Sequence, residues 1–191
     1  MSGVVLVRNR QRECRINARL LRGIVHSLLQ DRLGLSQFHL GVHLVGEPEM
    51  VRLNEAHLRH AGSTDVITFD YGSSAKQGDL AGEIFICVPE AVTQARRFRV
   101  TWQAEIVRYA VHGALHLLGY DDQTAAARRG MKSRENSLLK QLQSDFTLGK
   151  LGRRLGEIPG RNEKALRRKR KSSVRSAMYI VRRNRKQAQA P

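Results

Sequence analysis

Hydrophobic residues along most of this chain follow two spacings, one typical of strands and one typical of helices. Short apolar runs at 4–7, 66–69 and 83–88 predict three strands. Residues 38–45 alternate apolar positions with other residues, which predicts a fourth, half-buried strand.

Helical spacing separates the strands. Apolar residues recur every three or four positions from 16 to 29, and Gly34 suits the end of that helix. Four further helices are predicted where proline, acidic or capping residues precede an apolar stripe, at Glu47, Pro89, Thr101 and Thr124. The order of elements predicts an α/β (α+β) fold, a single domain in which five or six helices pack on a small mixed sheet of about four strands.

Charge divides the chain into two parts. The formal net charge is +17. Residues 1–146 carry 19 Lys and Arg against 15 Asp and Glu, whereas residues 147–191 carry 15 against 2. We therefore expect a domain over 1–146 and a basic C-terminal extension over 147–191. The extension has few apolar residues, so we expect it to be disordered in isolation and to bind nucleic acid through its charge.

The cysteines, two strand histidines and the length of the apolar stretches argue against several kinds of site and protein. Cys14 and Cys87 are too few and too far apart for a disulfide framework or a thiolate metal site. His39 and His43 lie on the polar face of their strand, where we expect them to be solvated. No apolar stretch approaches the roughly 20 residues that span a bilayer, and the N-terminus lacks a signal-peptide pattern, so we expect a cytoplasmic protein without membrane contact.

Metal-binding chemistry is indicated by the segment 112–122, His-Gly-Ala-Leu-His-Leu-Leu-Gly-Tyr-Asp-Asp. His112 and His116 are four residues apart, so both rings project from one face of a helix. Gly119 can adopt a left-handed conformation and end that helix. The chain can then turn back and place Tyr120, Asp121 or Asp122 beside the two rings, which predicts three ligands around a zinc ion with an open fourth position.

A similar ligand spacing occurs in the metzincin peptidases, which carry a glutamate directly after the first histidine as general base. That position is Gly113 here. A peptidase function is therefore disfavoured, because the base is missing.

Three segments resemble the YbeY family of bacterial rRNA maturation factors, which are metal-dependent endoribonucleases. The first is 112–121, which matches the family motif His-Gly-x-Leu-His-Leu-x-Gly-Tyr-Asp. The second is 54–69, which resembles Asn-x-x-x-x-Arg-x-x-x-x-Thr-Asp-Val-Leu-Ser-Phe, and the third is the strand 81–87. Order and spacing agree over roughly residues 3 to 145, and the resemblance implies a small sheet with five or six helices.

The resemblance also implies a set of site residues. The metal ligands would be His112, His116 and Asp122, holding one Zn(2+), and the catalytic residues would be His112 and Arg59. The family carries a third histidine where this chain has Asp122. A carboxylate lowers the net charge of the site and is a harder ligand, so weaker Lewis acidity and looser discrimination among divalent metals are expected. Asp121 remains an alternative ligand or a partner of one, and the proton acceptor is open.

The resemblance implies a single-strand-specific endoribonuclease that acts in maturation of the small-subunit rRNA 3′ end and in ribosome quality control. Its partners would be single-stranded RNA, rRNA and the small ribosomal subunit. The alternative is a non-catalytic ribosome-binding assembly factor with an altered metal site, which the aspartate at position 122 motivates. The sequence gives no indication of oligomeric state.

Overall fold

The computed structural model of the chain describes residues 2–58, 62–73, 78–155 and 179–182. The strands are β1 (Ser2–Asn9), β2 (Cys14–Ile16), β3 (Gln37–Val45), β4 (Val66–Asp70), β5 (Asp79–Cys87), β6 (Gly152–Arg154) and β7 (Tyr179–Arg182). The helices are α1 (Ala18–Ser27), which continues as the π-helix η1 (Leu28–Arg32), α2 (Glu47–Leu58), α3 (Val88–Phe98), α4 (Trp102–Leu117), α5 (Ala125–Asp145) and the 3-10 helix η2 (Leu148–Leu151).

The central sheet is mixed and has the strand order β1-β3-β5-β4-β7. Strands β1, β3 and β5 run parallel, β4 is antiparallel to β5, and β7 is parallel to β4. The predicted α/β domain is confirmed, and the four predicted strands are β1, β3, β5 and β4. Strand β7 and the small antiparallel sheet of β2 and β6 were not predicted.

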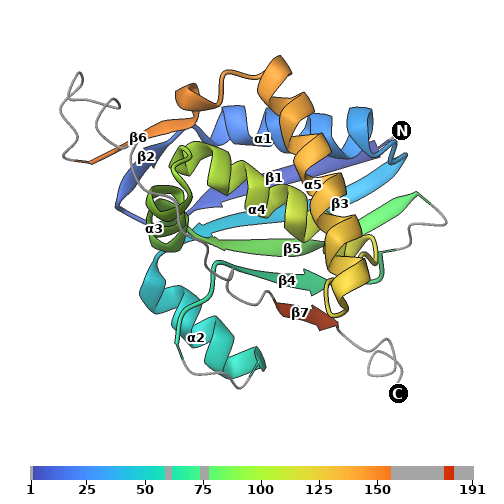
Figure 1. Cartoon of the computed structure of the whole chain (residues 1–191), viewed down its shortest axis with the longest axis horizontal. Coiled ribbons are helices and arrows are strands. Elements are labelled where there is room, and N and C mark those ends of the chain that lie inside the picture. Colours follow the sequence, from blue (N-terminus) through green and yellow to red (C-terminus); the bar gives the residue numbers. More distant parts are fainter. Residues whose placement is uncertain (1, 59–61, 74–77, 156–178, 183–191) are drawn as a thin grey trace.

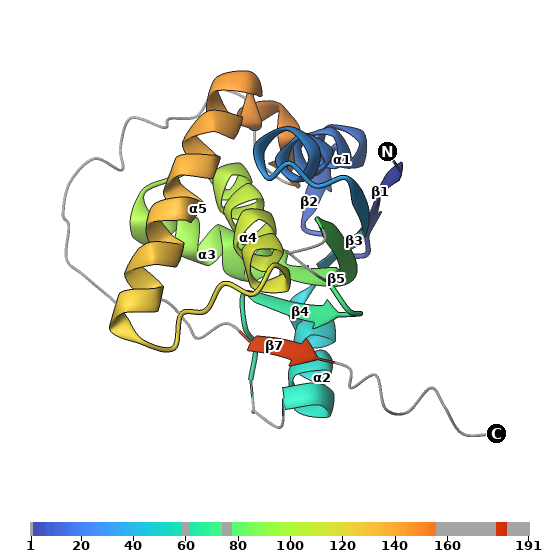
Figure 2. The ribbon, with the colours of Figure 1, turned by 90° about the vertical axis from the view of Figure 1, so that its right-hand side faces the viewer.

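Helices cover both faces of the central sheet (Figures 1 and 2). Helices α1, α3, α4 and α5 lie on one face and enclose the main hydrophobic core. Helix α2 lies on the other face, where its Met50 joins a smaller cluster with residues of β3, β4 and β5. Helix α4 is buried along most of its length and lies between the sheet and α5, so its side chains are held by packing on several sides. No helix in the described part of the chain is long and apolar enough to cross a membrane.

The folded body continues past residue 146. Leu148 and Leu151 of η2 are buried in the main core, and β6 pairs with β2. Residues 147–155 of the basic extension are therefore packed against the domain. Beyond them the structure describes only β7. Five consecutive basic residues of the extension, 167–171, lie outside the described residues.

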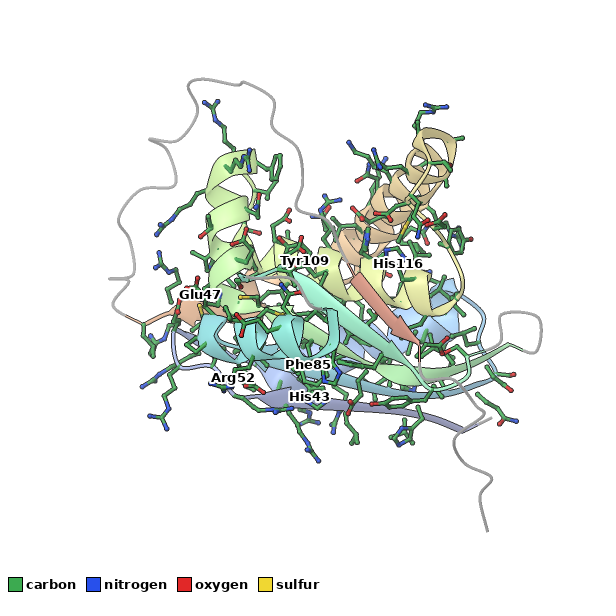
Figure 3. All side chains as sticks on the ribbon, turned by 90° about the horizontal axis from the view of Figure 1, so that it is seen from below. His43, Glu47, Arg52, Phe85, Tyr109 and His116 are labelled. Atoms are coloured by element: carbon green, nitrogen blue, oxygen red, sulfur yellow. The ribbon has the colours of Figure 1, made fainter. Side chains whose placement is uncertain are left out.

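His43 corrects one expectation. It is buried rather than solvated, and its ring stacks on Phe85 with 4.4 Å between centroids. Arg10 donates to its Nδ1 at 2.7 Å, and the carboxylate of Glu83 lies 3.1 Å from its Nε2. These neighbours come from other parts of the chain, which a strand periodicity cannot reveal. His43 and Phe85 lie on the α2 side of the sheet, away from His116 (Figure 3).

Candidate metal centre

Helix α4 positions the two histidines. Thr101 caps the helix by accepting a hydrogen bond from the backbone of Ala104, as predicted. At the other end Gly119 has a φ of 88°, a left-handed conformation that reverses the chain. The backbone N–H of Gly119 donates to the backbone carbonyl oxygen of His116 at 2.9 Å, and that of Tyr120 donates to the backbone carbonyl oxygen of Leu115 at 3.0 Å. The turn is therefore tight enough to return residues 120–122 to the histidine face of the helix.

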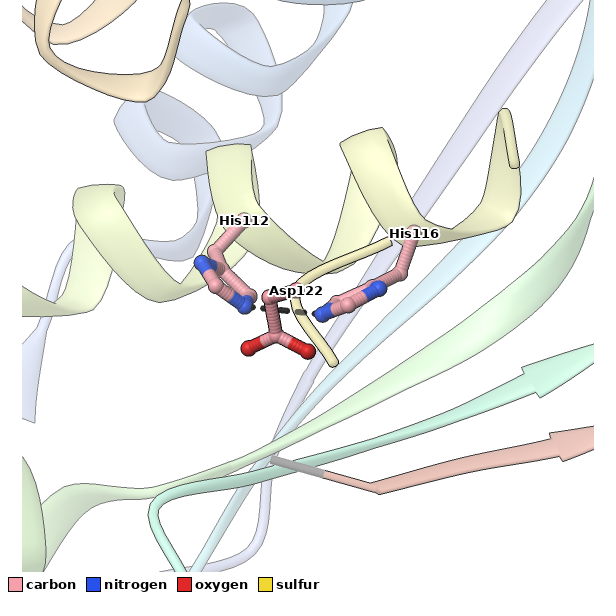
Figure 4. A group of neighbouring side chains, drawn as sticks. All are labelled: His112, His116 and Asp122. Carbon is pink, nitrogen blue, oxygen red and sulfur yellow. Dashed lines mark hydrogen bonds between the residues drawn. The ribbon is translucent and has the colours of Figure 1, made fainter. Parts of the chain in front are cut away.

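The structure brings His112, His116 and Asp122 together (Figure 4). One nitrogen of each ring and one carboxylate oxygen of Asp122 all lie within 4.8 Å of one another. Asp121 has a different task, because its Oδ1 accepts hydrogen bonds from the backbones of Asp122 at 2.7 Å and Gln123 at 3.0 Å. The geometry therefore favours Asp122 as the third ligand, with Asp121 shaping the turn that presents it.

Hydrogen bonds determine which ring nitrogens are protonated. The Nδ1 of His116 lies 2.9 Å from the carbonyl oxygen of Tyr120, which can only accept, so this Nδ1 carries the proton. The Nδ1 of His112 lies 2.7 Å from the carboxylate of Glu135 and donates to it in the same way. In the neutral rings both Nε2 atoms then carry lone pairs, and they face each other at 2.9 Å. A cation shared between them would stabilise this arrangement, so the residues present fit a divalent metal.

The charge state of His116 suits this role. Burial lowers the pKa of His116 below its usual value, and the neighbouring His112 lowers it further. The ring therefore remains neutral, and available as a ligand, to lower pH than an exposed histidine.

Glu135 of α5 is a site residue that the sequence did not predict. It is 1% exposed and accepts from His112 and, at 2.5 Å, from Arg108. Arg108 also pairs with the buried carboxylate of Glu105 at 3.3 Å. Glu135 falls on the same helical face as the apolar residues Met131 and Leu138. A charged residue on an apolar stripe is the signal that could have identified it.

Comparison with known proteins identifies the family of the chain. A family model described as endoribonuclease YbeY matches residues 6–143. The chain belongs to the YbeY family. An endoribonuclease YbeY from Finegoldia magna is 32% identical over 143 residues, covering 73% of this chain and 94% of the relative. One from Chlorobium luteolum is 43% identical over 91 residues, covering 48% of this chain, and the match spans only 64% of that relative's length.

A solved structure supports the fold. The solution structure of TM1509 from Thermotoga maritima superposes with a TM-score of 0.57 at 23% identity, covering 76% of this chain and 93% of that protein. The resemblance seen in the sequence is thus confirmed at the level of family and fold.

Gly113 shows why this YbeY-family site has no glutamate after its first histidine. A Cβ atom added at Gly113 would lie 2.9 Å from the Cδ1 of Ile84 and 3.0 Å from the Cγ2 of Thr68. Position 113 therefore faces the sheet, where even a methyl group would press against Ile84 and Thr68. The peptidase base is excluded by packing as well as by residue type.

The second family segment, 54–69, contains Asp65, His57 and the predicted catalytic residue Arg59. Asp65 is buried directly before β4, and its carboxylate accepts from Thr64 at 3.2 Å. Burial raises the pKa of Asp65 to about 6, although its electrostatic interaction with His112 acts in the opposite direction. His57 is exposed and its ring packs edge-on against Phe69. Arg59, the predicted catalytic arginine, lies outside the described residues.

Proposed function

We propose that this chain is a zinc-dependent endoribonuclease that cleaves single-stranded RNA during maturation of the small-subunit rRNA 3′ end and in ribosome quality control. The observation that carries the proposal is the pair of histidines, His112 and His116, whose Nε2 atoms converge beside the carboxylate of Asp122. Family membership supplies the reaction class. The compartment would be the cytoplasm, where rRNA is processed.

The chain's own residues have separable tasks in this proposal. His112, His116 and Asp122 would hold one zinc ion, which when bound supplies the positive charge that a scissile phosphate needs as its own charge grows. Glu135 and the carbonyl of Tyr120 orient the two rings. Arg59, directly after α2, would bind the phosphate through its guanidinium group.

Cleavage and metal analysis of purified protein test the proposal. The wild type should cleave single-stranded RNA and lose that activity with a chelator. His116→Ala should lose both metal and cleavage, whereas Arg59→Ala should lose cleavage and keep metal. His39→Ala, which changes an exposed histidine outside the site, is the matched control and should behave as the wild type. Chelator-resistant cleavage in His116→Ala would refute the assignment.

The second candidate is a ribosome-binding assembly factor without catalysis. Asp122, where the family carries histidine, is the observation that favours it. Metal content and binding to small ribosomal subunits separate the two functions. Wild-type protein that binds the subunit but holds no metal and cleaves no RNA would establish the assembly factor.

A further inference from the structure

Exposed cations lie on a face built from β1, β2, α1, η2 and β6. Figure 2 shows β1, β2 and α1 together on one side of the molecule. Two open hollows mark this face. Arg15, Lys150 and Arg153 line the first, and Arg8, Arg19 and Arg22 line the second. Consecutive residues line the two hollows, Asn17 the first and Ala18 the second. We call these six cations the arginine face.

Among the described residues, no acidic one lines either hollow. The side-chain ion pairs of arginine in this part of the chain involve Arg10, Arg32 and Arg108, and none involves the arginine face. The six exposed cations thus have no ion pair within the described residues, a condition that attracts a polyanion.

The positions of Arg15 and Arg153 support a role of the arginine face in binding an anion. Arg15 and Arg153 are directly opposite each other in the antiparallel pair of β2 and β6, and both are exposed. Like charges in this position destabilise a strand pair. The pairing is nevertheless close, since a Cβ at Gly152 would lie 2.2 Å from the carbonyl oxygen of Arg15. An anion bound between the two guanidinium groups would relieve the repulsion.

The arginine face is separate from the metal centre. Gln103, in the first turn of α4, donates to the carbonyl of Gly152 at 2.9 Å. His116 lies thirteen residues further along the same helix, which corresponds to about 20 Å. An RNA strand longer than a few nucleotides is needed to contact both places.

We propose that the arginine face is a second RNA-binding surface. It binds the phosphate backbone of the same single-stranded RNA that we propose is cleaved at the metal centre. Five of the six cations are arginines, whose planar fork of donors matches phosphate oxygens. The apolar residues of α1, Leu21, Ile24 and Val25, are buried, so the helix offers no apolar row for a bilayer. This inference rests on the proposed function for its choice of RNA.

Charge reversal in the full-length protein tests the arginine face. Arg153→Glu places a carboxylate opposite Arg15, so the midpoint of thermal unfolding should stay equal or rise. Its affinity for a long single-stranded RNA should nevertheless fall several-fold at low salt, and the slope of log affinity against log salt should flatten by about 0.7 for each phosphate that the variant no longer binds. Arg19→Glu, in the second hollow, should weaken binding in the same way, and Arg153→Lys should restore most of it.

Arg52→Glu provides the matched control, because it makes the same charge change at an exposed arginine of α2. It should alter RNA affinity less than Arg153→Glu does. Equal effects of the two variants, or a loss of stability in Arg153→Glu without a loss of RNA affinity, would overturn the proposal. So would a loss of binding to anionic vesicles with RNA binding unchanged.

Cleavage of a short RNA at saturating concentration separates this proposal from the proposed function. Arg153→Glu should cleave it at the wild-type rate, since such an RNA reaches only the metal centre. If the wild type cleaves no RNA, the proposed endoribonuclease activity is refuted. The comparison of RNA affinity between Arg153→Glu and Arg52→Glu still tests the arginine face in that case.

Discussion

The carboxylate of Glu135 lies 2.7 Å from the Nδ1 of His112, across the interface between α4 and α5. This contact joins the last helix of the domain to the metal centre. It fixes the orientation of the ring, and it increases the basicity of the nitrogen that faces His116.

Glu135→Gln should weaken zinc binding by about 10-fold to 100-fold, because the amide keeps the shape of the side chain but loses the charge that polarises His112. Zinc affinity can be measured by competition with a chromophoric chelator. Asn136→Ala is the matched control, since Asn136 accepts a hydrogen bond from the same Arg108 but is exposed and does not contact His112. An unchanged zinc affinity in Glu135→Gln would exclude a positioning role.

Asp122→His should bind zinc more tightly than the wild type and remain active, because it restores the three nitrogen ligands of the family. Isothermal titration with zinc, beside a cleavage assay, measures both properties. Asp121→Asn should leave zinc affinity unchanged, since the amide oxygen can still accept the two backbone hydrogen bonds of the turn. If Asp121→Asn loses zinc while Asp122→His does not gain it, the third ligand is Asp121.

Asp65 should make the stability of the metal-free protein depend on pH. Its pKa is about 6 in the folded chain against 3.8 for an ordinary aspartate, so folding favours the protonated form. The contribution is fully present below pH 3.8 and is lost as the pH rises through about 6, with a loss of about 3 kcal/mol at most.

Asp65→Asn mimics the protonated form. Its free energy of unfolding, measured with urea across this range, should therefore gain on the wild type as the pH rises from about 4 to about 6. The exposed Asp31→Asn serves as the control and should show no such trend. Parallel pH profiles for wild type and Asp65→Asn would contradict the burial of an ionisable Asp65.

Gly113→Ala should destabilise the protein by about 1–3 kcal/mol, because the added methyl group meets Ile84 and Thr68 at 3.0 Å or less. Urea unfolding measures this cost. The same substitution at Gly130 of α5 has nothing within 4 Å, so it should stabilise the helix by about 0.5–1 kcal/mol. Stabilisation at both positions would show that α4 packs less closely on the sheet.

Truncation after Leu155 removes the edge strand β7 and most of the basic extension, but it should leave the sheet of β1, β3, β5 and β4 and zinc binding intact. RNA affinity at low salt should fall, because the charge of the extension is lost. Truncation after Phe146 should in addition lower the unfolding temperature, since it removes the buried residues Leu148 and Leu151 and the strand β6. Circular dichroism melts and RNA binding over a salt series measure these effects. Equal melting temperatures for the two truncated chains would show that η2 and β6 add nothing to stability.

Short-range spacing determined much of this protein. The alternation and helical repeats predicted four strands and five helices because each depends on residues only a few positions apart. The convergence of His112, His116 and Asp122 could be foreseen for the same reason, since one helix turn and one glycine turn set their relative positions. Strands β2 and β6 have three residues each, too few for a periodic pattern.

Tertiary structure decided what depends on residues distant in the chain. Glu135 reaches His112 only because α5 packs against α4, and the burial that raises the pKa of Asp65 exists only once β4 is covered. Arg15 and Arg153 face each other because β6 returns to pair with β2. Burial and long-range pairing set the charge states and contacts of these side chains, and neither is encoded in local spacing.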